Sequence, residues 1–294
     1  LAAFDDEVKV DMGQPTKEAG MAALKALDRA MEDYKAGLYD VLVTAPINKN
    51  DIQSDEFHFC GHTEYIQDKV GDGKQALMIL AGETLRVALV TTHLPISQVA
   101  QAITKEAIME KARIFSEALR RDFNVASPRI AVLSLNPHAG DGGVIGMEEE
   151  TVIKPAIQEL SDEGIDAFGP FAADGFFGHG SYDAFDGVLA MYHDQGLAPF
   201  KTIVGDEGVN ITAGLPIVRT SPDHGTAYDI AGRGIANEAS FRNAVYKAID
   251  IFRNRKAYDE PLGNPLKKLY HERRDDSEKV RFAVPKAKTT ENNE

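Results

Sequence analysis

The alternation of short apolar runs with amphipathic segments is the feature that most constrains how this chain can fold. Runs rich in Val, Ile and Leu predict β-strands, at 41–44, 78–81, 85–91, 130–135, 187–191, 209–212 and 217–220. Apolar residues at helical spacing predict helices, at 16–36, 96–123 in two pieces, 148–163 and 238–255. Strands that alternate with helices over most of a chain indicate an α/β sheet flanked by helices.

Two further features refine this architecture. Only Gly82, Glu83 and Thr84 separate the second strand from the third, which is a hairpin pattern, so we expect a mixed sheet. The tail from about residue 280 contains few apolar residues, and we expect it to be disordered.

The charge and apolar pattern exclude several function classes. The chain of 294 residues has 32 Lys and Arg against 46 Asp and Glu, and its net charge of -14 repels nucleic acid and anionic lipid. An anionic small molecule would therefore need a local basic pocket. No apolar run in the sequence reaches the roughly 20 residues that a membrane span needs.

Cys60 is the one cysteine of the sequence, so no internal disulfide can form, and this fits the reducing cytoplasm. A structural role for its thiol is favoured over a nucleophilic one. The chain starts at Leu1 without the basic start and apolar run of a signal peptide. We expect the sequence to be a fragment of a longer protein.

Three histidines share one local context, because each comes shortly after a predicted strand. His93, His138 and His193 follow the strands 85–91, 130–135 and 187–191, in loops that contain Pro or Gly. In open α/β sheets this edge binds ligands, and three neutral imidazoles suit Zn, Co, Ni or Fe better than Mg alone. Any one of them could instead be a hydrogen-bonded loop histidine, but the repeated context favours a metal site.

A second group of residues suits an anion. Thr63 of Gly61-His62-Thr63-Glu64 could cap a short helix at 65–70, and a helix start binds phosphate. Lys201, Asn210 and Arg219 each lie near the end of a short extended run, and Lys and Arg are what a phosphate pocket needs. The alternatives are a plain helix cap and solvated surface charges.

Asp174 lies in a small-residue loop and could complete a histidine-rich metal shell, although a turn-forming role is the more common one for such an aspartate. The sequence has no Gly-x-Gly-x-x-Gly after a strand and no phosphate-loop Gly-Lys-Thr motif, so a Rossmann nucleotide site is not indicated.

Six motifs in a fixed order resemble one known family. They are GHTE at Gly61, TTHLP at Thr91, NPHAG at Asn136, MYHDQG at Met191, GVNIT at Gly208 and RTSPDHGTA at Arg219. In these segments, from about residue 40 to about residue 255, the chain closely resembles the 4-hydroxythreonine-4-phosphate dehydrogenase family of pyridoxal phosphate biosynthesis. Several separate motifs in the right order are far more specific than any single one.

The resemblance implies a two-domain α/β fold like that of isocitrate and isopropylmalate dehydrogenases, not a Rossmann fold. It also implies a homodimer with the active site at the subunit interface. We therefore expect a large domain of residues 1–50 and 220–294, with its N-terminal part missing from the sequence. A central domain of residues 51–219 would carry most of the site and the dimer contact.

By motif match, His93, His138 and His193 look like the metal ligands, in a site that draws on both subunits. Asp174 lies where the family has an aspartate beside the metal. The residues that look like substrate binders are His62, Thr63, Lys201, Asn210 and Arg219. Candidates for the general base are Lys201, Asp174 and His62, and no residue is assigned to cofactor binding.

The reaction implied by the resemblance is oxidation of 4-phosphooxy-L-threonine by NAD or NADP, with Zn, Co or Mg bound. The β-keto acid then loses CO₂ to give 3-amino-2-oxopropyl phosphate. Relatives that oxidise D-threonate or D-erythronate 4-phosphate in sugar-acid catabolism share these motifs. Two other classes are a phosphate acyltransferase, which needs no histidine-bound metal, and a metal-dependent phosphohydrolase or aldolase, which needs no nicotinamide. A non-catalytic binding protein is a further alternative.

Overall fold

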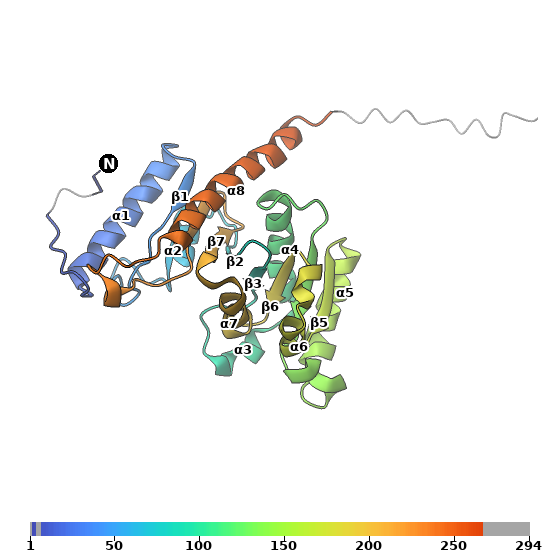
Figure 1. The fold of residues 1–294 in the computed structure, drawn as a ribbon. Coiled ribbons are helices and arrows are strands. Elements are labelled where there is room, and N and C mark those ends of the chain that lie inside the picture. Colours follow the sequence, from blue (N-terminus) through green and yellow to red (C-terminus); the bar gives the residue numbers. More distant parts are fainter. Residues whose placement is uncertain (1, 4–6, 267–294) are drawn as a thin grey trace, which may run out of the picture.

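The structure is a computed structural model that describes residues 2–3 and 7–266, with one mixed sheet of eight strands at its centre (Figure 1). The strand order is β1-β8-β7-β2-β3-β6-β4-β5. The strands are β1 (Val41–Val43), β2 (Leu77–Ala81), β3 (Arg86–Leu89), β4 (Arg129–Leu133), β5 (Asp166–Phe171), β6 (Gly187–Ala190), β7 (Val209–Ala213) and β8 (Val218–Pro222). The expected disordered tail from about residue 280 lies outside the described residues.

Eight α-helices accompany the sheet within the described ranges. They are α1 (Lys17–Lys35), α2 (His62–Val70), α3 (Ile96–Ala102), α4 (Lys105–Arg121), α5 (Lys154–Asp162), α6 (Ala173–Gly178), α7 (His193–Val204) and α8 (Ala239–Gly263). Figure 1 shows α1 at one end of the molecule and the long α8 running diagonally past β1 and β7. None of these helices combines the length and apolarity of a membrane span.

The expected hairpin and mixed sheet are confirmed. β2 pairs antiparallel with β3, with Ala81 opposite Arg86, and also antiparallel with β7. β3, β6, β4 and β5 then run parallel to one another. The carboxyl ends of these four strands therefore meet at a single edge of the sheet.

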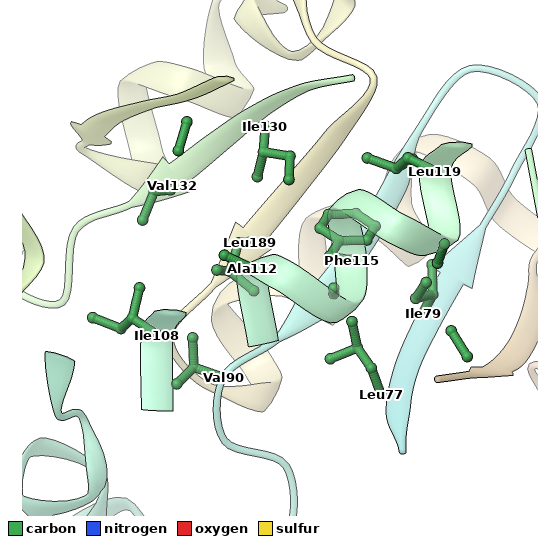
Figure 2. Close-up of a cluster of buried hydrophobic side chains, with 14 of the residues drawn as sticks. Leu77, Ile79, Val90, Ile108, Ala112, Phe115, Leu119, Ile130, Val132 and Leu189 are labelled. Atoms are coloured by element: carbon green, nitrogen blue, oxygen red, sulfur yellow. The ribbon is translucent and has the colours of Figure 1, made fainter. Parts of the chain in front are cut away.

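The largest part of the core covers one face of the sheet, beneath α4, α5 and α8. Figure 2 shows Phe115 of α4 in the midst of this cluster, with Ile79 and Ile130 of the sheet around it. Gly187 of β6 lies directly under the ring, because a Cβ there would come within 2.3 Å of Phe115 Cζ. The opposite face is covered by α6 and α7, whose buried residues include Phe176 and Phe200.

A third apolar cluster joins α1 and α2 to the end of the sheet that carries β1. It contains Leu24 and Met31 of α1, Tyr65 of α2 and Ile217 beside β8. Thr16 caps α1 by accepting a hydrogen bond from the Ala19 amide at 3.2 Å, as a threonine at this position commonly does. The predicted helix at 16–36 is confirmed.

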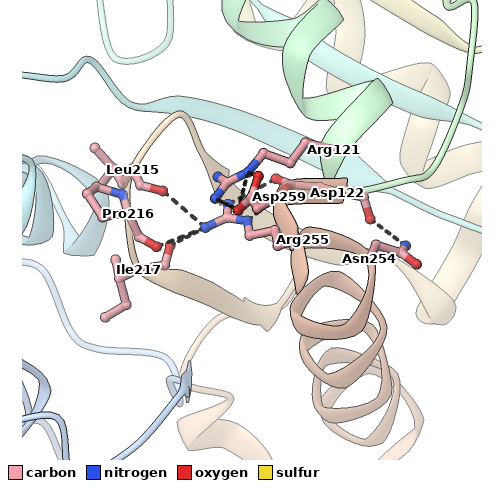
Figure 3. Close-up of polar contacts among 8 residues, drawn as sticks. All are labelled: Arg121, Asp122, Leu215, Pro216, Ile217, Asn254, Arg255 and Asp259. Carbon is pink, nitrogen blue, oxygen red and sulfur yellow. Dashed lines mark hydrogen bonds and ion pairs between the residues drawn. The ribbon is translucent and has the colours of Figure 1, made fainter. Parts of the chain in front are cut away.

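A buried ion pair ties α8 to the C-terminal end of α4 (Figure 3). Arg255 donates from Nε and Nη2 to the two carboxylate oxygens of Asp122, at 2.6 and 3.0 Å. Its Nη1 donates to the carbonyls of Leu215, Pro216 and Ile217. Such a guanidinium can be buried because all of its sides meet acceptors.

Three elements were not predicted, namely β5, α6 and α7. β5 contains Gly169 and Pro170, which weaken any strand pattern, and α7 contains Gly196 and Pro199. Gly196 is needed because a Cβ there would come within 2.8 Å of Val87 Cγ1 on the sheet. Close packing of α7 on β3 therefore overrides weak local helix propensity.

Candidate metal and substrate site

The three histidines follow three strands that lie side by side. β6 pairs with both β3 and β4, all in parallel, so His93, His193 and His138 emerge at the same edge of the sheet. His193 is the first residue of α7, not a loop residue as the sequence indicated, and its ring centroid lies 6.3 Å from that of His93. At a metal–nitrogen distance of about 2.1 Å, two imidazoles on one tetrahedral ion have ring centroids about 5.3 Å apart. The two rings are therefore neighbours at a spacing about 1 Å wider than that of coordinated rings.

His138 is exposed on a left-handed turn within η1 (Pro137–Gly143), where φ is positive at six successive residues from His138 to Gly143. Non-glycine residues are rarely found in this conformation. Within the described part of the chain, no three His, Cys, Asp or Glu side chains come together as ligands of one ion. The structure thus brings His93 and His193 together and leaves His138 apart from them.

Glu149 anchors the start of the His138 turn. Its fully buried carboxylate accepts hydrogen bonds from the amides of Leu135 and Asn136, both at 2.8 Å, and from Asn136 Nδ2 at 3.0 Å. Burial acts to raise the pKa of Glu149, but these hydrogen bonds to Asn136 and Leu135 outweigh it and lower the pKa. The carboxylate therefore holds the segment that carries His138.

His93 lies between two charged side chains. Glu64 Oε1 is 3.5 Å from His93 Nδ1, and Lys49 Nζ is 3.4 Å from His93 Nε2. The hydrogen bond from His93 holds the pKa of Glu64 below its usual range. Sequence reasoning missed both Lys49 and Glu64. Glu64 stands inside the GHTE motif, which was the available signal. Lys49 lies five residues beyond the predicted strand 41–44 and belongs to none of the six motifs.

The cavity beside His93 has a volume of about 210 Å³ and holds four of the five expected substrate binders. Its lining includes His62, Thr63, Asn210 and Arg219. Asn210 Oδ1 is buried without a protein hydrogen-bond partner among the described residues. A buried polar atom of this kind has room for a ligand donor.

Arg219 provides a buried positive charge to this cavity, which Lys49 also lines. Only 3% of its surface is exposed, and its guanidinium donates to the hydroxyls of Thr44 and Thr212. Burial lowers the pKa of Arg219 to about 10, although the nearby charge of Glu64 opposes the shift. The side chain is thus still a cation near neutral pH, and among the described residues its hydrogen-bond partners are hydroxyls and not a carboxylate.

His62 is a neutral imidazole in the same cavity. Burial, then the charges of Arg219 and Lys49, lower the pKa of His62 to about 3, against a smaller opposing effect of Glu64. At neutral pH it can therefore donate one hydrogen bond and accept another.

Lys201 lines a neighbouring cavity of about 370 Å³. It lies in α7, not in an extended run as the sequence indicated, and its Nζ is 3.0 Å from the Asp223 carbonyl and 3.2 Å from Asp223 Oδ1. Burial raises the pKa of Asp223, and the Lys201 charge opposes that shift. His224 lines both cavities, so they adjoin each other.

Two local expectations at the site need correction. The helix expected at 65–70 is α2, which begins at His62, and its N-cap residue is Gly61, so the Thr63 side chain does not cap it. Thr63 Oγ1 instead lies 3.5 Å from Thr212 Oγ1. Asp174 is exposed in the first turn of α6, not in a loop.

Comparison with known proteins decides the family. The family described as "Pyridoxal phosphate biosynthetic protein PdxA" matches residues 2–248. The chain belongs to the PdxA family. A relative from Bacteroides thetaiotaomicron, named 4-hydroxythreonine-4-phosphate dehydrogenase, is 61% identical over 278 residues, which cover 95% of this chain and 76% of the relative.

Solved structures agree with this assignment to the PdxA family. The 4-hydroxythreonine-4-phosphate dehydrogenase from Klebsiella pneumoniae superposes with a TM-score of 0.71 at 35% identity, over 82% of this chain and 73% of that chain. Isocitrate dehydrogenase from Methylococcus capsulatus, 14% identical with a TM-score of 0.51 over 83% of this chain and 78% of that chain, shares the fold. The expected family and the expected isocitrate dehydrogenase-like fold are both confirmed.

Proposed function

We propose that the protein oxidises the secondary alcohol of 4-phosphooxy-L-threonine with NAD or NADP, using a bound divalent metal. The β-keto acid product then loses CO₂ to give 3-amino-2-oxopropyl phosphate, in pyridoxal 5'-phosphate biosynthesis. The observation that carries the proposal is the adjacency of two sites. The His93–His193 pair lies beside a cavity whose buried cation is Arg219. Membership of the PdxA family supports the same substrate.

The cavity residues recognise an anionic substrate in this otherwise acidic chain. Arg219 is preorganised by its hydroxyl partners and can form a charge-assisted hydrogen bond to a phosphate or carboxylate oxygen. Asn210 Oδ1 can accept a hydrogen bond from a substrate hydroxyl or ammonium group, and neutral His62 and Thr63 add further donors and acceptors. Together they fix the orientation of the substrate.

Lys201 is the group that takes the hydroxyl proton. With a pKa of about 3, His62 is too weak a base for this task near neutral pH. As the general base, the Lys201 amine would accept the hydroxyl proton, and Asp223 Oδ1, 3.2 Å from Nζ, would stabilise the ammonium that forms. Asp174 stays a weaker candidate because it is exposed on α6.

His93 and His193 would hold the metal, with His138 as the third ligand. Zn, Co or Mg bound there would act as a Lewis acid toward the alcohol and the later ketone oxygen. Because His138 lies apart from the pair in one chain, we propose a homodimer in which the second subunit completes the site. We place the nicotinamide cofactor in the cavity beyond His224, since hydride transfer needs a cofactor next to the substrate.

The proposal also covers the domain division and the cellular location of the protein. We propose the division into a large domain of residues 1–50 and 220–294 and a central domain of residues 51–219, as well as a cytoplasmic location that suits the exposed free thiol of Cys60. Oxidation of D-threonate or D-erythronate 4-phosphate is the second candidate, because Arg219 and the metal pair would serve those substrates equally. An acyltransferase would have no use for the paired imidazoles.

The test is formation of NADH or NADPH from three substrates, 4-phosphooxy-L-threonine, D-threonate 4-phosphate and D-erythronate 4-phosphate. We expect turnover of the threonine compound and its loss in chelator. Turnover of the sugar-acid phosphates alone would show that the second candidate function is the correct one. Metal-loaded protein that turns over none of the three would contradict the proposal.

A further inference from the structure

Two charged neighbours determine which ring nitrogen of His93 can bind a metal, and this inference rests on the proposed metal site. A lysine ammonium has only donors, so the nitrogen that faces Lys49 Nζ, His93 Nε2, must carry a lone pair. The Glu64 carboxylate has only acceptors, so the nitrogen that faces it, His93 Nδ1, must carry the proton. The two neighbours together select one tautomer, with Nε2 available for a metal.

His193 has a similar partner. Its Nδ1 lies 2.7 Å from Asp194 Oδ1, so both rings of the pair have a carboxylate at Nδ1. The two carboxylates differ in their surroundings. The Asp194 side chain is 85% exposed, whereas that of Glu64 is 37% exposed and its Oε2 is buried without a partner among the described residues. Solvent screens Asp194 far more than Glu64.

We propose that Glu64 and Lys49 set the metal affinity of His93 in opposite directions. Glu64 is a positioning residue that orients the ring and increases the basicity of Nε2. Lys49 occupies Nε2 in the metal-free protein, and a divalent cation must displace it. Both side chains line the substrate cavity, so the displaced Lys49 ammonium stays beside the anionic substrate. When the metal binds, the Lys49 ammonium thereby leaves the His93 imidazole and becomes available to the anionic substrate.

The proposal predicts that substitutions of Glu64 and Lys49 change the Zn²⁺ affinity in opposite directions. Glu64→Gln keeps the size of the side chain but removes its charge, and should weaken binding about 10- to 100-fold, as is usual for a carboxylate behind a histidine ligand. Lys49→Met removes the competing cation and should tighten binding roughly 5- to 30-fold, from the repulsion between a monovalent and a divalent charge. Asp194→Asn is the matched control and should change affinity less than Glu64→Gln.

The experiment is a competition titration of the full chain with Zn²⁺ against a chromophoric chelator, with the Co²⁺ absorption spectrum as a second readout. Circular dichroism establishes that each variant is folded. Weaker binding in Glu64→Gln with tighter binding in Lys49→Met supports the proposal, especially if Lys49→Met also raises KM. Unchanged Zn²⁺ affinity in both variants overturns the proposal. If His93→Ala nevertheless loses Zn²⁺, the proposed metal site still stands. A wild-type chain that binds no Zn²⁺, or a His93→Ala variant that binds it equally well, overturns the metal site and this inference together.

Discussion

Arg219 reaches from β8 to Thr44, which follows β1, and donates from both Nε and Nη2 to the same hydroxyl, at 3.2 and 2.7 Å. These bonds fix the plane of a guanidinium that is almost fully buried. The orientation of the anion-binding group is therefore set before any substrate arrives, which reduces the ordering cost of binding.

Replacing Arg219 by Met should weaken substrate binding by about 2–3 kcal/mol, in line with a lost hydrogen bond to a charged group. Cofactor affinity should change much less, because Arg219 lines only the first of the two adjoining cavities. Separate titrations with substrate and with NAD measure this. Arg253→Ala, on the exposed side of α8, is the control. Equal losses for both ligands would show that Arg219 is structural.

The buried pair of Arg255 and Asp122 should dominate the electrostatic contribution to stability. Asp122→Asn leaves a buried guanidinium without its counter-charge, and should lower the free energy of unfolding by about 3–5 kcal/mol. The neighbouring Arg121–Asp259 pair is partly exposed, at 28% and 47% of the side chains, so Asp259→Asn should cost at most about 1 kcal/mol. Urea unfolding of both variants tests the contrast, and similar losses would contradict it.

His62 should make the protein less stable in acid. The unfolded chain binds a proton at this histidine below its ordinary pKa of 6.5, whereas the folded protein does so only near pH 3. Its contribution to stability is therefore fully present above pH 6.5 and is lost as pH falls toward 3. We expect the His62 resonances in NMR to keep their neutral shifts at pH 5, identified by comparison with His62→Gln. A titration midpoint of the His62 resonances near pH 6.5 would refute this account of His62.

The Glu149 carboxylate should control the position of His138 without touching a ligand. Glu149→Gln keeps the shape of the side chain but weakens the hydrogen bonds that anchor the segment before His138. We expect reduced Zn²⁺ affinity together with a lower melting temperature. Glu150→Gln, at the adjacent residue, is the control because the Glu150 carboxylate forms an ion pair with Lys154. A variant of Glu149 with native metal affinity would show that the turn does not depend on this carboxylate.

The sequence predicted best where a pattern is local. The hairpin of β2 and β3, the split helix 96–123 and the position of each histidine after a strand follow from apolar periodicity and turn residues. It failed at α7, where contact of Gly196 with the sheet decides the conformation. Lys49 and Glu64 were missed because their role arises from contacts with His93, and the Lys49 contact spans 44 positions of sequence. Such contacts leave no periodic trace in a single sequence.

The most direct test of the central claim uses chelator-stripped protein, with NADH formation from 4-phosphooxy-L-threonine followed before and after Zn²⁺, Co²⁺ or Mg²⁺ is returned. We compare the wild-type chain with three variants, His93→Ala, His138→Ala and His193→Ala. Circular dichroism first establishes that each variant is folded. The account predicts that metal restores turnover in the wild type alone, with little metal bound by any of the three variants. Full metal occupancy and turnover in the His138→Ala variant would contradict the assignment of these histidines as the metal ligands.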